Sequence, residues 1–241
     1  MSADSTSEVA PPARTVPMAL RRRSFVRSAV AGVGSLVIGA HVISCSASSP
    51  RRADDADPAP VQTTSTRGTV LLAYFSRAGE NYLNGGRTWL DVGNTEVLAS
   101  MISRLVACDV HHIQPAKPYP ADYEATVERN LREQQANARP AIANPLASVG
   151  RYDVVLLGSP IWNVRAPLIM SAFAEGFDFT GKTIFPFTTH AMSGLGSSVR
   201  DYARSCPGAT IGEGLAVRGE EVRDAGPAVE AWVRRTGLPG R

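Results

Sequence analysis

The chain becomes strongly apolar at Thr69-Val-Leu-Leu-Ala-Tyr-Phe75 and then turns polar at Ser76-Arg77-Ala78-Gly79. An unbroken apolar run of this length favours a strand that is buried on both faces, as the strands of parallel sheets are. Asp153-Val-Val-Leu-Leu-Gly158 repeats the pattern and is the most apolar of the later runs. Because helical patterns separate the two runs, they indicate an α/β domain with a parallel sheet.

Strand and helix patterns alternate through the rest of this region. Further strands are predicted at 109–114, 182–188 and 209–217. One helix is predicted to follow Asn94-Thr95 and to include Leu105, and others are predicted at 122–135, 167–177, 197–205 and 224–235. Five strands that alternate with helices predict a three-layer, doubly wound, five-stranded parallel sheet in one domain. Pro186 is awkward inside its predicted strand because proline has no N–H to donate to a neighbouring strand.

The charge of the predicted domain is close to neutral. The chain of 241 residues has 25 basic and 22 acidic residues, and residues 61–241 hold 18 of the basic and 17 of the acidic ones. A domain with so little net charge has no extended positive field to hold a phosphate backbone. Nucleic acid is therefore not an expected partner.

The N-terminal segment has the features of an export signal. Arg22-Arg23-Ser24-Phe25-Val26-Arg27 matches the twin-arginine pattern. The apolar run that follows, 29–43, has fifteen residues, whereas a helix that spans a bilayer needs about twenty. A signal peptide fits this short run better than an anchor helix does.

Val42-Ile43-Ser44-Cys45 resembles a bacterial lipobox, in which the cysteine receives a lipid and becomes the mature N-terminus. The alternative is an ordinary cleaved signal with an incidental cysteine. We predict a signal peptide at 1–45, a flexible tether at 46–67 and the folded domain at 68–237. The protein is then exported, and is either anchored through Cys45 to the outer face of the cytoplasmic membrane or secreted.

Three loops follow predicted strands whose carboxyl ends share one edge of the sheet, where doubly wound sheets bind ligands. The first loop leads to a helix N-terminus at Asn94-Thr95 with hydroxyls and small residues, which suits a phosphate group. Simple helix capping by Asn94 or Thr95 is the alternative. The chain has neither a Walker lysine nor a G-x-G-x-x-G pattern here, which argues against nucleoside triphosphate hydrolysis and dinucleotide binding.

The second loop carries an aromatic side chain that could stack on a ligand, and the third loop carries hydrogen-bonding side chains. Trp162 follows the strand that ends at Gly158 and could stack on a flat ring, or it could merely cover the strand end. Thr189, His190 and Ser193 follow the strand that contains Pro186, and glycines among them allow close backbone approach.

These motifs in this order resemble the flavodoxin-like family over about residues 69–232. The segments that carry the resemblance are Tyr74-Phe75-Ser76-Arg77, Gly93-Asn94-Thr95, Gly158-Ser159-Pro160-Ile161-Trp162, Thr189-His190 and Ser193-Gly194-Leu195-Gly196. The resemblance implies strand order 2-1-3-4-5 and non-covalently bound flavin mononucleotide (FMN).

The resemblance also implies roles for residues around the cofactor. Residues of the first loop would bind the phosphate, the Trp162 loop would pack against the ring, and the third loop would border the pyrimidine edge. The candidate cofactor-binding residues are Ser76, Arg77, Ala78, Gly93, Asn94, Thr95, Pro160, Ile161, Trp162, Asn163, Thr189, His190, Ser193, Gly194 and Gly196. No catalytic residue and no metal ligand is assigned.

The first loop departs from the family pattern because Ala78 to Val92 separates Ser76 from Gly93. We expect this insertion to be irregular, with a mobile turn at Gly85-Gly86 that could act as a lid. Whether Gly79 to Asn81 contact the phosphate stays open.

The implied strand order also bears on the cysteines. Cys108 and Cys206 would lie at opposite edges of the sheet, roughly 19 Å apart over four strand spacings. A disulfide needs Cα atoms within about 7 Å, so we predict two free thiols.

Together these features predict an FMN-dependent electron carrier or oxidoreductase outside the cytoplasmic membrane. Its partner would be a redox protein or a small acceptor such as a quinone, with the membrane surface contacted through lipidated Cys45. Two alternatives remain open. One is a flavin-free ligand-binding or interaction lipoprotein with the same fold, and the other is a deazaflavin-binding redox protein.

Overall fold

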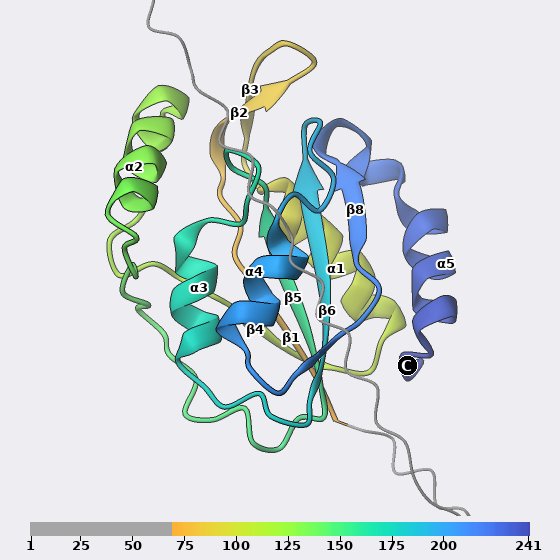
Figure 1. Cartoon of the computed structure of the whole chain (residues 1–241). Coiled ribbons are helices and arrows are strands. Elements are labelled where there is room, and N and C mark those ends of the chain that lie inside the picture. Colours follow the sequence, from red (N-terminus) through yellow and green to blue (C-terminus); the bar gives the residue numbers. More distant parts are fainter. Residues whose placement is uncertain (1–68) are drawn as a thin grey trace, which may run out of the picture. The chain divides into compact units, whose positions relative to one another are not determined.

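The structure is a computed structural model that describes residues 69–241 (Figure 1). The predicted signal peptide at 1–45 with Cys45, and the tether at 46–67, lie outside the described residues. In chain order the elements are β1 (Val70–Tyr74), β2 (Gly79–Leu83), β3 (Gly86–Leu90), α1 (Asn94–Leu105), β4 (Asp109–His112), α2 (Tyr123–Gln135), β5 (Val154–Pro160), α3 (Leu168–Glu175), β6 (Thr183–His190), α4 (Ser198–Ser205), β7 (Thr210–Ile211), β8 (Leu215–Arg218), the 3-10 helix η1 (Gly219–Asp224) and α5 (Gly226–Thr236).

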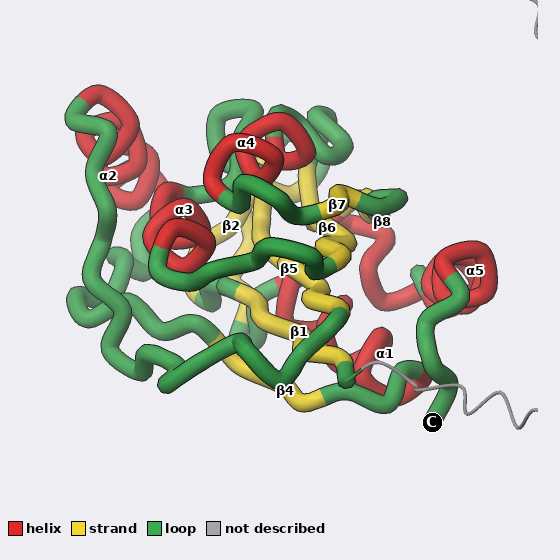
Figure 2. The backbone as a smooth tube through the Cα atoms, turned by 60° about the horizontal axis from the view of Figure 1, so that its bottom comes forward, coloured by secondary structure: helices red, strands yellow, loops and turns green. Residues whose placement is uncertain are grey.

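The main sheet has the order β4-β1-β5-β6-β7, with β8 also beside β6, and all its pairs are parallel. Numbered as the five predicted strands, this order is 2-1-3-4-5. Helices α1 and α5 cover one face, and α3 and α4 cover the other (Figure 2). The predicted three-layer, doubly wound, flavodoxin-like fold is confirmed.

The apolar run in β1 is continuous because the strand contributes to two cores. Leu71 and Ala73 pack in the core beneath α3 and α4, whereas Val70 and Leu72 pack in the core beneath α1 and α5. All four side chains are almost fully buried. Alternate residues of a strand point to opposite faces, so a strand covered on both faces needs apolar residues at every position.

The predicted fifth strand, 209–217, is two short strands with a break between them, which corrects the prediction. Backbone groups alternate along a parallel strand, so Pro186 faces the same neighbour as Ile184. The carbonyl of Ile184 accepts from Gly212 N–H at 2.8 Å. Two residues further on, Pro186 has no N–H to offer, and the partner strand is interrupted at Glu213 before β8 resumes pairing at Phe187.

The insertion between Ser76 and Gly93 is a regular hairpin rather than an irregular loop, which also corrects the prediction. Strands β2 and β3 pair in antiparallel fashion, with Leu83 opposite Gly86. The turn residues Asn84 and Gly85 have φ of 46° and 86°. Both values are left-handed, as in the tight hairpin turns that favour Asn-Gly. The hairpin stands at the same end of the domain as the carboxyl ends of β6 and β8 (Figure 1).

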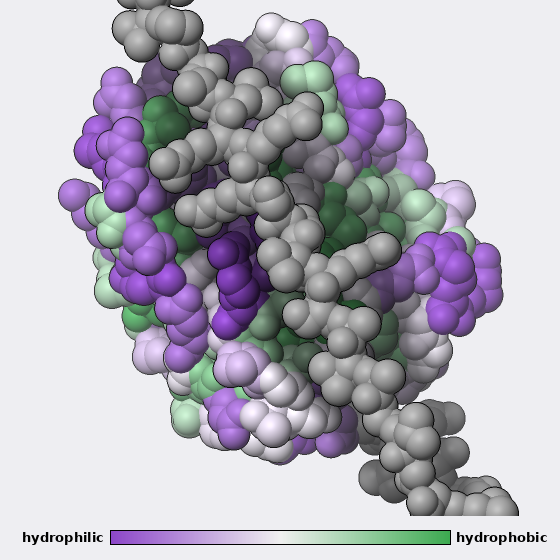
Figure 3. All heavy atoms as spheres, viewed as in Figure 1, coloured by the Kyte–Doolittle hydropathy of each residue, from purple (hydrophilic) through white to green (hydrophobic). Residues whose placement is uncertain are grey.

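Hydrophilic side chains gather over α2 and over α5 (Figure 3). Within residues 69–241, no helix has both the length and the apolar character needed to cross a bilayer.

Cys108 and Cys206 are free cysteines, as predicted.

Candidate functional site

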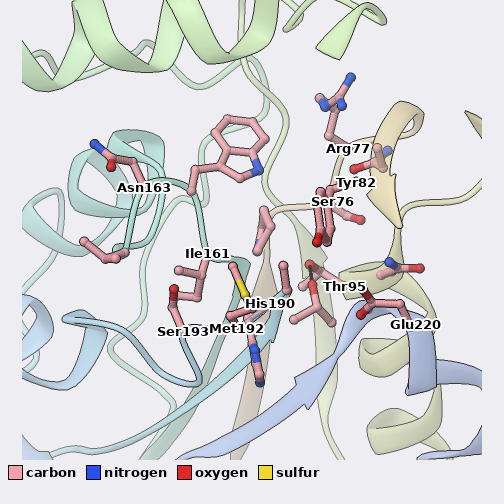
Figure 4. A pocket seen from close by; sticks show the side chains of 18 of the residues that line it. Ser76, Arg77, Tyr82, Thr95, Ile161, Asn163, His190, Met192, Ser193 and Glu220 are labelled. Atoms are coloured by element: carbon pink, nitrogen blue, oxygen red, sulfur yellow. Dashed lines mark hydrogen bonds between the residues drawn. The ribbon is translucent and has the colours of Figure 1, made fainter. Parts of the chain in front are cut away.

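A cavity of about 340 Å³ lies where the carboxyl ends of β1, β5 and β6 meet the hairpin, the start of α1 and the start of η1 (Figure 4). Its lining residues are Ser76, Arg77, Asn81, Tyr82, Asn94, Thr95, Tyr123, Pro160, Ile161, Trp162, Asn163, Val164, Thr189, His190, Ala191, Met192, Ser193, Gly219 and Glu220. The three predicted loops therefore converge on one cavity, although they are far apart in the sequence.

Most of the predicted site residues line this cavity, and four do not: Ala78, Gly93, Gly194 and Gly196. Two of these four, Gly93 and Gly196, lie close against residues of the cavity wall. A Cβ at Gly93 would lie 2.3 Å from Ser76 Oγ, and one at Gly196 would lie 2.4 Å from the carbonyl oxygen of Val164. Both positions therefore require glycine, because a side chain would push neighbouring loops apart.

The N-terminus of α1 is one end of the cavity. Its N-cap is Gly93, which has no side chain to cap the helix, so Asn94 and Thr95 do not serve as caps. Ser76 Oγ accepts from Glu96 N–H at 3.1 Å. Among the described residues, the backbone N–H groups of Asn94 and Thr95 have no hydrogen-bond partner. A helix start with free N–H groups attracts anions.

The hydroxyls of Thr95 and Thr189 join two walls of the cavity. Their Oγ1 atoms are 2.7 Å apart, and both side chains are buried. This hydrogen bond links the first turn of α1 to the carboxyl end of β6. The start of α1 and the end of β6 are thereby held at a set distance.

The guanidinium of Arg77 is turned away from this end of the cavity (Figure 4). It donates to the carbonyls of Pro120 and Ala121 at 2.9 and 3.0 Å, and also to the carbonyl of Glu80. Burial lowers the pKa of Arg77 from its usual value. These bonds connect the base of the hairpin to the loop before α2. The guanidinium of Arg77 therefore stabilises this part of the cavity wall.

Trp162 is held in a fixed orientation by two aromatic neighbours. Its ring makes edge contacts with Phe75 and Tyr119, at centroid distances of 5.6 and 5.1 Å. Tyr119 is itself fixed, because its hydroxyl donates to Glu133 at 2.7 Å and the guanidinium of Arg129 lies 3.8 Å over its ring. The indole is half-buried and lines the cavity.

The residues after Trp162 form a tight turn. Trp162 and Arg165 exchange backbone hydrogen bonds of 2.8 and 3.3 Å, and between them Asn163 and Val164 have φ of 49° and 61°. A β-branched residue rarely adopts such a φ, and strain of this kind often lies beside functional sites. Asn163 Nδ2 donates to Gln134 Oε1 at 2.9 Å, which anchors the turn to α2.

A family comparison agrees with this geometry. A flavodoxin family model matches residues 88–236. The chain belongs to the flavodoxin family. No match was found among curated proteins.

Two solved structures are similar to this chain. A candidate flavoprotein from Bacteroides eggerthii is 30% identical, with 71% of this chain and 99% of that chain covered and a TM-score of 0.58. A second candidate flavoprotein, from Bacteroides uniformis, is also 30% identical, with 69% and 98% covered and a TM-score of 0.55. A flavoprotein in complex with FMN from Lactobacillus acidophilus is more distant, at 18% identity, 66% and 99% covered and a TM-score of 0.46.

His190 is a further polar group of this flavodoxin-family cavity. Burial, with a smaller contribution from Arg218, lowers the pKa of His190, which favours the neutral imidazole. Its Nδ1 is buried and has no hydrogen-bond partner among the described residues. A neutral imidazole can either donate or accept a hydrogen bond at this atom.

Sequence reasoning did not assign eight of the lining residues. They are Asn81, Tyr82, Tyr123, Val164, Ala191, Met192, Gly219 and Glu220. The Asn84-Gly85 turn signal between two strand-like segments could have found the hairpin that brings in Asn81 and Tyr82. The start of α2 and the start of η1 carry no local signal, because only the tertiary fold brings them to the cavity.

The hairpin is docked by charged and aromatic contacts. The guanidinium of Arg87 lies 3.6 Å over the ring of Tyr123 and forms a 2.7 Å ion pair with Glu124. Glu80 Oε2 accepts from Tyr123 N–H at 3.1 Å. The hairpin therefore contacts the start of α2, and this contact brings Tyr123 to the cavity.

Within residues 69–241, no group of three His, Cys, Asp or Glu side chains could hold a metal ion.

Proposed function

We propose that this protein binds FMN in the cavity and acts as an electron carrier or oxidoreductase. The observation that carries the proposal is the pairing of an anion-attracting helix start with a fixed indole in one cavity. A phosphate suits the first, and a flat aromatic ring suits the second. The two similar Bacteroides proteins, described as candidate flavoproteins, add support.

Polar atoms on the cavity wall fit such a ligand. Among the described residues, Arg77 Nε, His190 Nδ1 and Glu220 Oε2 are buried without hydrogen-bond partners, and all three residues line the cavity. Buried polar groups are seldom left unpaired in native proteins. A ligand with several hydrogen-bond donors and acceptors is a natural partner for such groups.

The residues have separable tasks in this proposal. Backbone N–H groups and side chains of Asn94 and Thr95, with Ser76, bind the phosphate, and Trp162 packs against the ring. Backbone and side chains around Thr189 and His190 border the polar edge of the ring. FMN itself supplies one- and two-electron chemistry, and the protein supplies the binding, the orientation and the electrostatic surroundings.

An absorbance spectrum of the purified full-length chain tests the proposal. We expect paired visible bands of a bound flavin, and heat release should yield FMN. A spectrum with a deazaflavin chromophore would replace FMN by that cofactor. A colourless protein that takes up no added FMN would instead favour a flavin-free ligand-binding lipoprotein.

The phosphate end can be tested separately. The double substitution Asn94→Ala with Thr95→Ala is expected to weaken FMN binding about tenfold, since bonds to a charged group are lost. Binding of riboflavin, which has no phosphate, should change less than twofold. Quenching of flavin fluorescence measures both affinities, and equal losses for the two ligands would contradict the assignment of the phosphate site.

We also propose, from the N-terminal sequence, that the protein is exported and lipidated at Cys45. Cys45→Ala is expected to move the protein from the membrane fraction to the soluble fraction of its native host, as detected by immunoblot. A lipid anchor would hold the domain near membrane quinones, which makes a quinone the proposed acceptor. Unchanged membrane association of Cys45→Ala would contradict the anchor.

Catalytic turnover separates the two forms of the redox proposal. A quinone reductase is expected to consume many equivalents of a nicotinamide donor with a soluble quinone. An electron carrier is expected to accept electrons only in proportion to its own concentration. Following the donor's absorbance in the presence of excess quinone distinguishes them.

A further inference from the structure

Glu220 occupies an unusual position at one end of the cavity. Helix η1 begins against the start of α1, because a Cβ added to Gly219 would lie 2.6 Å from Asn94 Nδ2. The next residue, Glu220, lines the cavity, and its side chain is only 9% exposed. Its carboxylate is turned towards Thr95, at the N-terminus of α1 (Figure 4).

The two carboxylate oxygens of Glu220 have different surroundings. Oε1 accepts from Asn84 N–H at 3.2 Å, at the tip of the hairpin. Oε2 is buried and has no hydrogen-bond partner among the described residues. Arg218 forms an ion pair with this oxygen, its Nε lying 3.7 Å from Oε2, a distance too long for a hydrogen bond.

The carboxylate is nevertheless ionised near neutral pH. Burial by itself raises the pKa of Glu220, but hydrogen bonds from its own N–H and from Asn84 N–H, with the charge of Arg218, hold the pKa below its usual value. A buried anionic oxygen without a hydrogen-bond partner is unfavourable. A hydrogen-bond donor that enters the cavity would remove that penalty.

Resting on FMN as the ligand, we propose that Glu220 is a ligand-recognition residue that binds the hydroxylated chain between the flavin ring and the phosphate. Oε2 accepts a hydrogen bond from a hydroxyl of that chain, while Oε1 keeps the hairpin tip against the cavity. The position beside the start of α1 favours this part of the ligand, because the hydroxyls closest to the phosphate lie there. The flat ring, by contrast, lies with Trp162.

Glu220 differs from a surface ion-pair residue in its burial and in its position on the cavity wall. Glu221 is the natural comparison, because it is adjacent, it also lies near Arg218, at 3.9 Å, and it is 66% exposed. Exposed pairs of this kind contribute little. Glu221 does not line the cavity, so it provides a matched control for charge without ligand contact.

The test compares wild type, Glu220→Gln and Glu221→Gln in the full-length chain, freed of bound flavin. Binding of riboflavin and of lumiflavin, which has the ring but no hydroxylated chain, is measured by fluorescence quenching. Glu220→Gln is expected to raise the riboflavin Kd about tenfold, since a hydrogen bond to a charged acceptor becomes one to a neutral acceptor. The lumiflavin Kd should change less than twofold, and Glu221→Gln should change neither.

Three results would overturn the inference. An unchanged riboflavin Kd in Glu220→Gln, with wild type binding normally, shows that Glu220 does not contact the chain and leaves the proposed function intact. An equal loss for lumiflavin shows that the substitution acts on the hairpin or the ring site instead. Wild type that binds neither FMN nor riboflavin removes the proposed function and this inference together.

Hydrogen exchange at the hairpin gives an independent readout in the protein without ligand. Gln at position 220 keeps an oxygen that can accept from Asn84 N–H, so exchange of this amide should stay within about twofold of wild type. Glu220→Ala removes the acceptor and should speed that exchange about tenfold or more. Equal exchange in both variants and wild type would show that Glu220 does not hold the hairpin tip.

Discussion

Replacing Gly158 with alanine is expected to lower the free energy of unfolding by about 3 kcal/mol, the upper part of the range for overpacking a core. A Cβ at this position would lie 2.0, 2.3 and 2.7 Å from three ring atoms of Phe187. Phe187 is fully buried and is the register partner of Gly158 across β5 and β6. Protein cores are close-packed, so the ring and the paired backbone can shift only at a cost.

Urea unfolding followed by circular dichroism measures this effect. Gly226→Ala is the matched control, because no atom lies within 4 Å of its added Cβ, and its stability should stay within about 0.5 kcal/mol of wild type. Adding Phe187→Leu to Gly158→Ala should recover part of the loss, since the smaller side chain makes room for the methyl group. A stability of Gly158→Ala equal to wild type would contradict the close packing of β5 on Phe187.

Replacing Trp162 with alanine is expected to weaken FMN binding at least about tenfold, because stacking contributes on the order of 1 kcal/mol beyond the buried area of the ring. The fixed contacts of Trp162 with Phe75 and Tyr119 mean that little entropy is lost when the indole meets a ligand. Trp162→Phe, which keeps an aromatic face, should lose less affinity than Trp162→Ala.

The hairpin supplies a matched control for this prediction. Trp89 is 64% exposed and does not line the cavity, so Trp89→Ala should leave the FMN Kd unchanged within about twofold. Fluorescence quenching by titration with FMN measures all three variants. An FMN Kd for Trp162→Ala that equals the value for Trp89→Ala would remove Trp162 from the ligand site.

The location of the site could be read from the sequence because its causes are local or follow from topology. Strands buried on both faces require continuous apolar runs, and the carboxyl ends of parallel strands share one edge of a sheet. The loops after β1, β5 and β6 therefore had to meet, and residues such as Ser76, Trp162 and His190 line one cavity. The same strand order predicted the free thiols of Cys108 and Cys206.

Side-chain direction was not predictable in the same way. Arg77 follows a strand at the site and looked like a phosphate ligand, yet its guanidinium donates to carbonyls of residues 80, 120 and 121. The choice depends on where the loop before α2 places its carbonyls. That loop is more than forty residues away in the sequence.

What the sequence by itself determined was the α/β class, the strand order through family resemblance, and the edge of the sheet that carries the site. What only the tertiary structure decided was which distant segments complete that edge: the hairpin, the start of α2 and the start of η1. Apolar periodicity shows that a segment is buried, but it does not identify the segment that packs against it. The hydrogen bond from Asn84 N–H to Glu220 joins residues 136 positions apart, and no local pattern in either segment encodes that partner.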